Sequence, residues 1–176
     1  MKKLIFIIAI ALSASAAVQA IEVDLHNPKL SQVAANYKGF NYINIVGFND
    51  SPTGYFALYN EKGTSNPIRL WSLNIGSSTE GGQHLYLHDY GSRCAGRANN
   101  LDNVILKVEG RNVMFYTYCS EDKYRYYTPK TDRGGKYVVN AFSQGRFVTI
   151  ENLDYKLMFS TDGFAKAWND FGGDAI

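Results

Sequence analysis

The residues whose types and spacing first suggest chemistry are two histidines four positions apart, His84 and His88. On a helix, such a pair could share one zinc ion. Here the histidines alternate with Leu85 and Leu87, which is typical of a β-strand with one apolar face. In a strand that rises about 3.3 Å per residue, the two imidazoles lie roughly 13 Å apart, too far to bind the same metal. We therefore expect a polar strand face and no metal site.

Catalysis has little support in the sequence. The chain has no Gly-x-Ser-x-Gly elbow and no glycine loop of the phosphate-binding type. A carboxylate pair could hydrolyse a glycosidic bond if two acids met in a cleft about 5–10 Å apart. The acids that fall at or near expected strand ends are Glu109, Glu121, Asp122, Glu151 and Asp154. Such positions are usually solvated turns, so we expect no catalytic residue and no cofactor, while the carboxylate pair stays open as an alternative.

Tyrosines are concentrated in one short stretch of the chain. Tyrosine gives a large contact area at a low entropic cost, and a neighbouring arginine adds a charged anchor. Tyrosine also fills the rims of β-protein cores, so we expect some of these rings to be buried. The residues that we predict to form a binding surface are Tyr116, Tyr118, Tyr124, Arg125, Tyr126 and Tyr127.

The chain contains two cysteines, Cys94 and Cys119. Their spacing is unlike the Cys-x-x-Cys of redox proteins, and no nearby feature favours a reactive thiolate. In an oxidising compartment an isolated pair of this kind forms a disulfide. We predict a structural disulfide between them.

The first twenty residues have the pattern of a cleavable signal peptide. Lys2 and Lys3 precede an unbroken apolar run from Leu4 to Leu12, which is too short to span a bilayer, and small residues lead to Ala20. We predict a signal peptide over residues 1–20 and a single globular domain over residues 21–176. The mature chain is then periplasmic or secreted, with no membrane span.

Removal of the signal peptide also balances the charge. The chain has 18 Lys and Arg against 16 Asp and Glu, and the loss of Lys2 and Lys3 leaves 16 of each sign. A balanced chain lacks the basic excess that nucleic-acid binding requires. We expect no nucleic-acid partner.

Most of the mature chain alternates apolar and polar residues between turn formers, a pattern that predicts strands. The expected strands cover residues 40–48, 55–59, 68–75, 83–90, 104–109, 113–119, 124–128, 146–150 and 155–159. Gly110, Arg111 and Asn112 indicate a hairpin turn between two of them.

Two helices are expected in the C-terminal third. Thr131 or Asp132 could cap the first, with Gly145 placed to end it, and Ser160 or Thr161 could cap the second. The expected fold class is mainly β (α+β), an antiparallel sandwich or open barrel of about eight strands with these two short helices.

Together these features favour an exported, non-enzymatic binding protein. Its expected partner is another protein of the cell envelope or exterior, as for an inhibitor or an immunity-type protein. The alternative is a carbohydrate-binding protein or a hydrolase active on the cell wall.

Overall fold

The computed structural model describes residues 20–30, 35–49, 51–94, 102–120, 124–152 and 155–172. Except for Ala20, the expected signal peptide lies outside the described residues, as do Glu121, Asp122 and Asp154.

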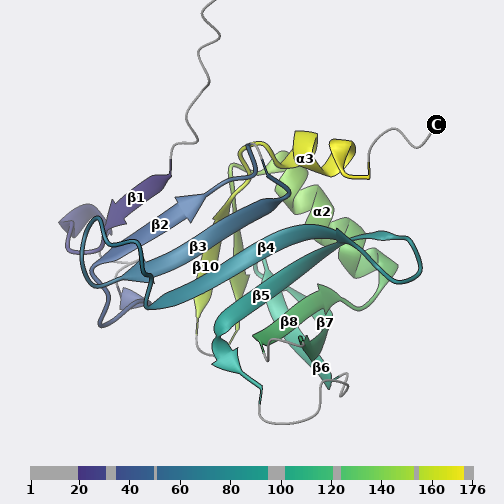
Figure 1. Ribbon diagram of the computed structural model, residues 1–176, viewed down its shortest axis with the longest axis horizontal. Helices are drawn as coiled ribbons and strands as arrows, with labels where there is room; N and C mark the ends of the chain where they lie inside the picture. Colours follow the sequence, from purple (N-terminus) through teal and green to yellow (C-terminus); the bar gives the residue numbers. More distant parts are fainter. Residues whose placement is uncertain are drawn as a thin grey trace, which may run out of the picture.

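The described residues form ten strands in one antiparallel sheet (Figure 1). The strands are β1 Ile21–Asp24, β2 Tyr42–Val46, β3 Thr53–Tyr59, β4 Arg69–Ser77, β5 Gln83–Arg93, β6 Asp102–Val108, β7 Arg111–Cys119, β8 Tyr124–Pro129, β9 Phe147–Glu151 and β10 Lys156–Ser160. They lie side by side in the order β1-β2-β3-β4-β5-β8-β7-β6-β9-β10. The antiparallel architecture is as expected, with ten strands instead of about eight.

The sheet curls until its last strand returns to its first strands. β10 packs against β2 and β3, although its hydrogen-bonded neighbour in the described sheet is β9, and Figure 1 shows it behind β3. Inward-facing side chains from both walls fill the interior: Phe56 of β3 contacts Trp71 of β4 and Phe159 of β10, with ring centroids 5.7 and 6.3 Å apart. The fold is therefore an open barrel with an aromatic core.

Helix α2, Asp132–Gln144, has the boundaries that the sequence predicts. Oγ1 of Thr131 accepts a hydrogen bond from the Gly134 N–H at 3.1 Å, and Gly145 is the C-cap. Val138 and Phe142, on one side of the helix, are buried in the core. The expected cap and stop are both confirmed.

Helix α3, Phe164–Asp170, is confirmed as an element, but its expected cap is wrong. Gly163 takes the N-cap position in the left-handed conformation, with no side-chain cap. The hydroxyl of Thr161 instead donates to the carbonyl of Gly145, 2.5 Å away, because the end of α2 lies beside it. A short 3-10 helix, Pro28–Leu30, lies between β1 and β2.

Two further details differ from expectation. The four-residue strand β1 was not predicted, since so short a segment shows too little alternation. The turn between β6 and β7 is Glu109–Gly110, one residue earlier than expected, and both residues have positive φ, 47° and 75°. Positive φ at both central residues is the type I′ geometry that matches strand twist.

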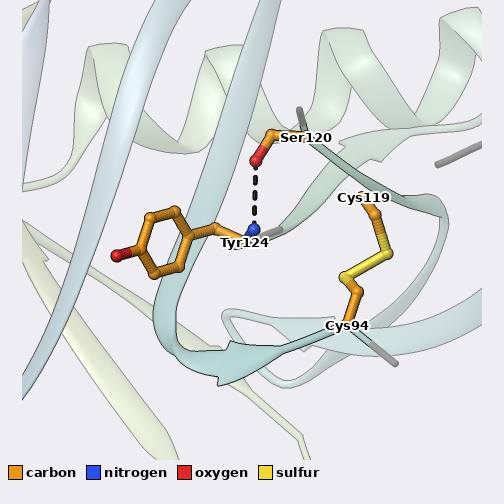
Figure 2. The surroundings of a disulfide bond; sticks show 4 residues. All are labelled: Cys94, Cys119, Ser120 and Tyr124. Atoms are coloured by element: carbon orange, nitrogen blue, oxygen red, sulfur yellow. Dashed lines mark hydrogen bonds between the residues drawn. A yellow bond between two sulfur atoms is a disulfide. The ribbon is translucent and has the colours of Figure 1, made fainter. Parts of the chain in front are cut away.

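The predicted disulfide between Cys94 and Cys119 is present (Figure 2), with the two Cα atoms 6.1 Å apart. Since β8 lies between β5 and β7 in the sheet, the bond joins the ends of two strands that flank a third. Beside it, the hydroxyl of Ser120 accepts a hydrogen bond from the Tyr124 N–H at 3.0 Å, where β8 begins. Within the described ranges, no helix has the length and apolar character needed to cross a membrane.

Candidate functional site

Strands β5, β8 and β7 expose one side of the sheet and bury the other. On β5, Leu85 and Leu87 are almost fully buried, so the alternating residues His84, Tyr86 and His88 point away from the core. The neighbouring strands have the same outer side, because His88 pairs with Tyr126 of β8 and Tyr126 pairs with Tyr118 of β7. Directly paired residues lie on the same side of a sheet.

Aromatic rings cover this outer side in a connected row. Tyr90 and Tyr124 have centroids 5.2 Å apart, His88 and Tyr126 4.0 Å, and Tyr118 and Tyr126 5.3 Å. The row continues along β7 to Tyr116 and Met114, and Met114 pairs with Ile105 of β6. We call this surface the tyrosine face; its members are Tyr86, His88, Tyr90, Ile105, Met114, Tyr116, Tyr118, Tyr124 and Tyr126.

The middle of the tyrosine face is neutral at ordinary pH. Burial beneath the neighbouring rings lowers the pKa of His88 to about 4. Burial, reinforced by the nearby Tyr86 and Tyr126 phenols, raises the pKa of Tyr118 to about 12. The amide of Asn74 on β4 donates to the His88 ring, 3.1 Å from Nε2. The imidazole and the phenol are therefore both uncharged near neutral pH.

The edge of the tyrosine face is more exposed than its middle and carries cations. Ile105 is 58 % exposed and Met114 is 43 % exposed. Two lysines bound the face: Lys107 extends from the end of β6, and Nζ of Lys130 lies 5.1 Å from the Tyr116 ring centroid. An apolar, aromatic middle with a polar rim is the usual anatomy of a protein interface.

Four of the six predicted binding residues lie together on the tyrosine face: Tyr116, Tyr118, Tyr124 and Tyr126. Arg125 and Tyr127 project from the opposite side of β8. Tyr127 pairs with Leu87 and packs against the core, and Arg125 pairs with the buried Asp89. The predicted cluster is thus divided between two sides of one strand.

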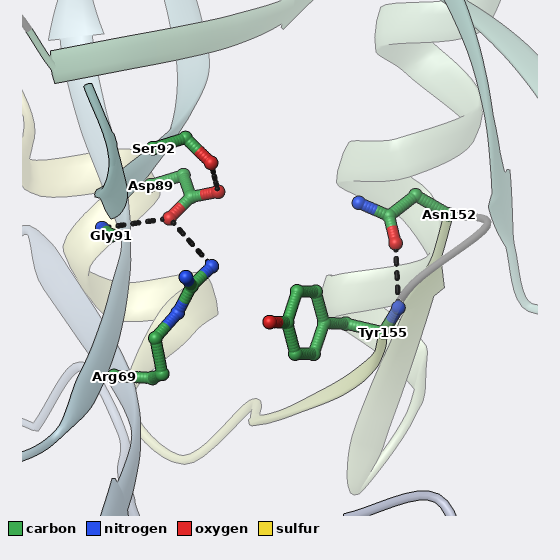
Figure 3. Close-up of polar contacts among 6 residues, drawn as sticks. All are labelled: Arg69, Asp89, Gly91, Ser92, Asn152 and Tyr155. Atoms are coloured by element: carbon green, nitrogen blue, oxygen red, sulfur yellow. Dashed lines mark hydrogen bonds and ion pairs between the residues drawn. The ribbon is translucent and has the colours of Figure 1, made fainter.

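The inner side of β4, β5 and β8 carries a polar cluster at one end of the barrel (Figure 3). The guanidinium of Arg69 forms an ion pair with Asp89, with Nη2 3.5 Å from Oδ1. Its Cζ also lies 5.0 Å from the Trp71 ring centroid and 4.9 Å from that of Tyr155. Tyr155 precedes β10 on the far wall, so the arginine links both walls of the barrel. We call this end of the barrel, with Arg69, Asp89, Arg125 and Tyr155, the barrel mouth.

Asp89 did not emerge from the sequence as a candidate residue, although it is only 4 % exposed. The signal was available, because Asp89 continues the alternation of Leu85 and Leu87 and so had to point into the core. A carboxylate on a buried strand face requires partners, which makes such a position a natural candidate.

The remaining chemical candidates do not converge in the described residues. Glu109 hydrogen-bonds to Thr149, and Glu151 forms an ion pair with Lys156 at 3.0 Å. No group of three or more His, Cys, Asp or Glu side chains that could hold a metal ion occurs within the described ranges. The histidines predicted to lie on a strand do so, both on β5.

A depression with a volume of about 550 Å³ lies between α2, α3 and the adjoining ends of β5 and β8. Its walls include Lys130, Lys136, Val139, His84 and Trp168. The buried polar atoms that lack a hydrogen-bond partner in the described residues belong to residues elsewhere in the fold. The described lining of the depression therefore has no buried polar atom that lacks a hydrogen-bond partner, and so gives no indication of a particular ligand.

Comparison with protein-family models, with curated proteins and with solved structures finds no match to this chain.

Proposed function

We propose that this protein is an exported, non-enzymatic binding protein that recognises another protein through the tyrosine face. The observation that carries the proposal is the connected row of uncharged aromatic rings, continued by the exposed pair Ile105 and Met114 and bordered by Lys107 and Lys130. Tyrosine-rich, desolvated centres supply most of the binding energy in protein interfaces.

Ring geometry favours a protein over a glycan. A sugar stacks on an aromatic ring whose flat face is free, but Tyr118 and Tyr126 stack on each other at an interplanar angle of 28°. His88 meets the Tyr126 ring nearly perpendicularly, at 89°. These rings pack mainly on one another and present edges and hydroxyls, which suit side chains and backbone of a partner.

Export is supported by the amino-terminal pattern of the sequence and is compatible with the disulfide. The partner is then a protein of the cell envelope or exterior. An inhibitor or immunity-type role fits a small exported domain with a tyrosine-rich face.

The test begins with affinity capture on the mature, oxidised protein, followed by measurement of the dissociation constant for any stoichiometric partner. Replacing an interface tyrosine by alanine costs about 2 kcal/mol or more at a central position, a weakening of roughly thirtyfold. We expect this loss for Tyr116→Ala and for Tyr124→Ala, with little change in the thermal midpoint.

Tyr55→Ala is the matched control, because Tyr55 is 37 % exposed on β3, outside the tyrosine face. Unchanged affinity in both tyrosine-face variants would contradict the proposal. So would retention of the protein on peptidoglycan alone, with no protein partner.

A further inference from the structure

The barrel mouth contains two arginines and one aspartate on the same side of three adjacent strands. Asp89 of β5 pairs directly with Arg125 of β8, and on its other side it forms the ion pair with Arg69 of β4. The described residues at this position therefore carry a net charge of +1, because the two arginines outnumber the single aspartate.

The carboxylate of Asp89 is already engaged by three other residues. Oδ1 accepts from the Gly91 N–H at 2.9 Å and faces Arg69, while Oδ2 accepts from the Ser92 hydroxyl at 2.6 Å (Figure 3). Gly91 and Ser92 lie where the pairing of β5 with β8 shifts register. Asp89 thus binds groups at the irregular end of its own strand together with Arg69, and the ion pairs found among the described residues do not include Arg125.

Both arginines hold a buried donor that has no acceptor. Nε of Arg69 and Nε of Arg125 are shielded from solvent and make no hydrogen bond in the described part of the chain. Folded proteins rarely leave a buried N–H unpaired, and for a charged guanidinium the cost is higher than for a neutral group. A ligand oxygen placed beside these donors would satisfy them.

We propose that the barrel mouth is a binding site for a carboxylate, held by Arg125 together with Arg69. Among the described residues of the mouth, the excess of one positive charge matches a monovalent anion, and the fixed negative charge of Asp89 disfavours phosphate and other dianions. Guanidinium groups bind carboxylates with charge-assisted, often bidentate hydrogen bonds.

The ligand approaches the arginines from solvent. The cavity that Asp89 lines, together with Trp71 and Asn152 among others, has a volume of about 10 Å³, and neither arginine lines it. That volume is about the size of one water molecule, so the body of the ligand stays outside. The carboxylate belongs to a chain end, an acidic side chain or a sugar acid that reaches the mouth from solvent.

Arg69 is held in place before the ligand arrives. Its guanidinium lies against both the Trp71 and Tyr155 rings, whose centroids are 4.9 Å apart, and a Cβ added to Gly91 would stand 2.4 Å from its Cζ. The absence of a side chain at Gly91 therefore creates the space that Arg69 occupies. A donor fixed in this way loses little conformational entropy when it binds.

This site goes beyond the proposed function, because Arg125 and the tyrosine face lie on opposite sides of β8. Loss of the carboxylate site would leave the tyrosine face intact, and loss of the tyrosine face would leave the carboxylate site intact.

The experiment follows the Nε–Hε signals of the arginines by NMR while the mature, oxidised protein is titrated with N-acetylglycine. N-acetylglycinamide is the neutral control, and sodium chloride is matched for ionic strength. We expect saturable shifts of the Arg69 and Arg125 signals with N-acetylglycine only. In Arg125→Lys, the dissociation constant rises roughly tenfold, as expected for loss of a charge-assisted hydrogen bond. Arg133→Lys, on the exposed surface of α2, leaves it unchanged.

Shifts that chloride reproduces, or sulfate bound as tightly as N-acetylglycine, would overturn the proposal. The wild-type titration decides the matter even if Arg125→Lys fails to fold. A parallel titration with glucuronate separates the sources: tighter binding of N-acetylglycine assigns the site to a peptide carboxylate, and tighter binding of glucuronate to a sugar acid.

Discussion

Glu109 accepts two hydrogen bonds from Thr149, a residue 40 positions further along the chain. Its Oε1 lies 2.6 Å from the Thr149 nitrogen and 2.9 Å from the hydroxyl oxygen. The Glu109 N–H also donates to the Thr149 carbonyl at 3.1 Å. Strands β6 and β9 share two paired positions, Lys107 with Glu151 and Val108 with Ile150. The turn residue therefore extends a short seam through which β9 and β10 join the rest of the sheet.

Replacing Glu109 by alanine should lower the free energy of unfolding by about 1–2 kcal/mol, since an exposed but charge-assisted pair of hydrogen bonds is lost. Glu109→Gln, which keeps an acceptor, should lose less. Urea denaturation followed by circular dichroism measures both. Glu80→Ala, at an exposed turn position, is the control. Equal stability of Glu109→Ala and Glu80→Ala would show that the seam does not depend on this carboxylate.

Local patterns predicted most of the elements. Alternation predicted a strand over residues 113–119, and in β7 Val113 and Phe115 are buried on one side while Met114 and Tyr116 lie on the other. The cap and stop of α2 were predicted because Thr131 and Gly145 act through bonds within a few residues. The disulfide was predictable because the chain offers only one pairing of its two cysteines.

Long-range relationships were not predictable. Strand β8 lies between β5 and β7, and β6 pairs with β9. The composition of a strand does not identify the strand with which it pairs. For the same reason, the predicted tyrosine cluster mixed two sides of β8: Tyr126 meets His88 on the outer side, whereas Tyr127 packs against the core. The ion pair of Arg69 with Asp89 depends on the pairing of β4 with β5 as well.

Removal of the disulfide should lower the free energy of unfolding by about 3.5 kcal/mol, the value that loop-closure entropy gives for a sequence separation of 25 residues. The physical reason is that the unfolded chain regains freedom that the bond between Cys94 and Cys119 removes. Guanidinium denaturation of the wild type and of the double variant Cys94→Ser with Cys119→Ser measures the difference. If the two proteins unfold at the same midpoint, the bond does not constrain the unfolded chain.

Stability should fall as the pH is lowered from about 6.5 towards 4, through His88. Burial lowers its pKa from 6.5 to about 4 in the folded protein, so in this window the unfolded chain binds a proton that the folded chain does not. The stabilisation that the neutral imidazole gives is fully present above pH 6.5 and is lost as the pH falls through the folded pKa. Thermal midpoints measured across this range should fall with decreasing pH. The slope of midpoint against pH should be smaller in His88→Gln, and unchanged in His26→Gln, where the replaced residue is exposed. An unchanged slope in His88→Gln would assign the acid sensitivity to other groups.

The segment before α3 touches the connection between β2 and β3 so closely that Gly163 should not tolerate alanine. Gly163 has φ of 78°, and a Cβ there would lie 2.6 Å from the backbone nitrogen of Asn49. The same approach is fixed by a hydrogen bond from the Phe48 N–H to the Asp162 carbonyl at 2.6 Å. Left-handed strain and overpacking together predict a loss of about 2–5 kcal/mol for Gly163→Ala.

Gly172 provides a matched control for that variant. It has φ of 93° but no heavy atom within 4 Å of an added Cβ, so Gly172→Ala should show the strain alone, about 1–2 kcal/mol. Urea denaturation of both variants separates the two contributions, because they differ in contact and share the backbone conformation. Similar losses at the two glycines would mean that the turn before α3 moves away from Asn49 at little cost. The close approach of Asp162 and Gly163 to the end of β2 would then not be what holds α3 against the barrel.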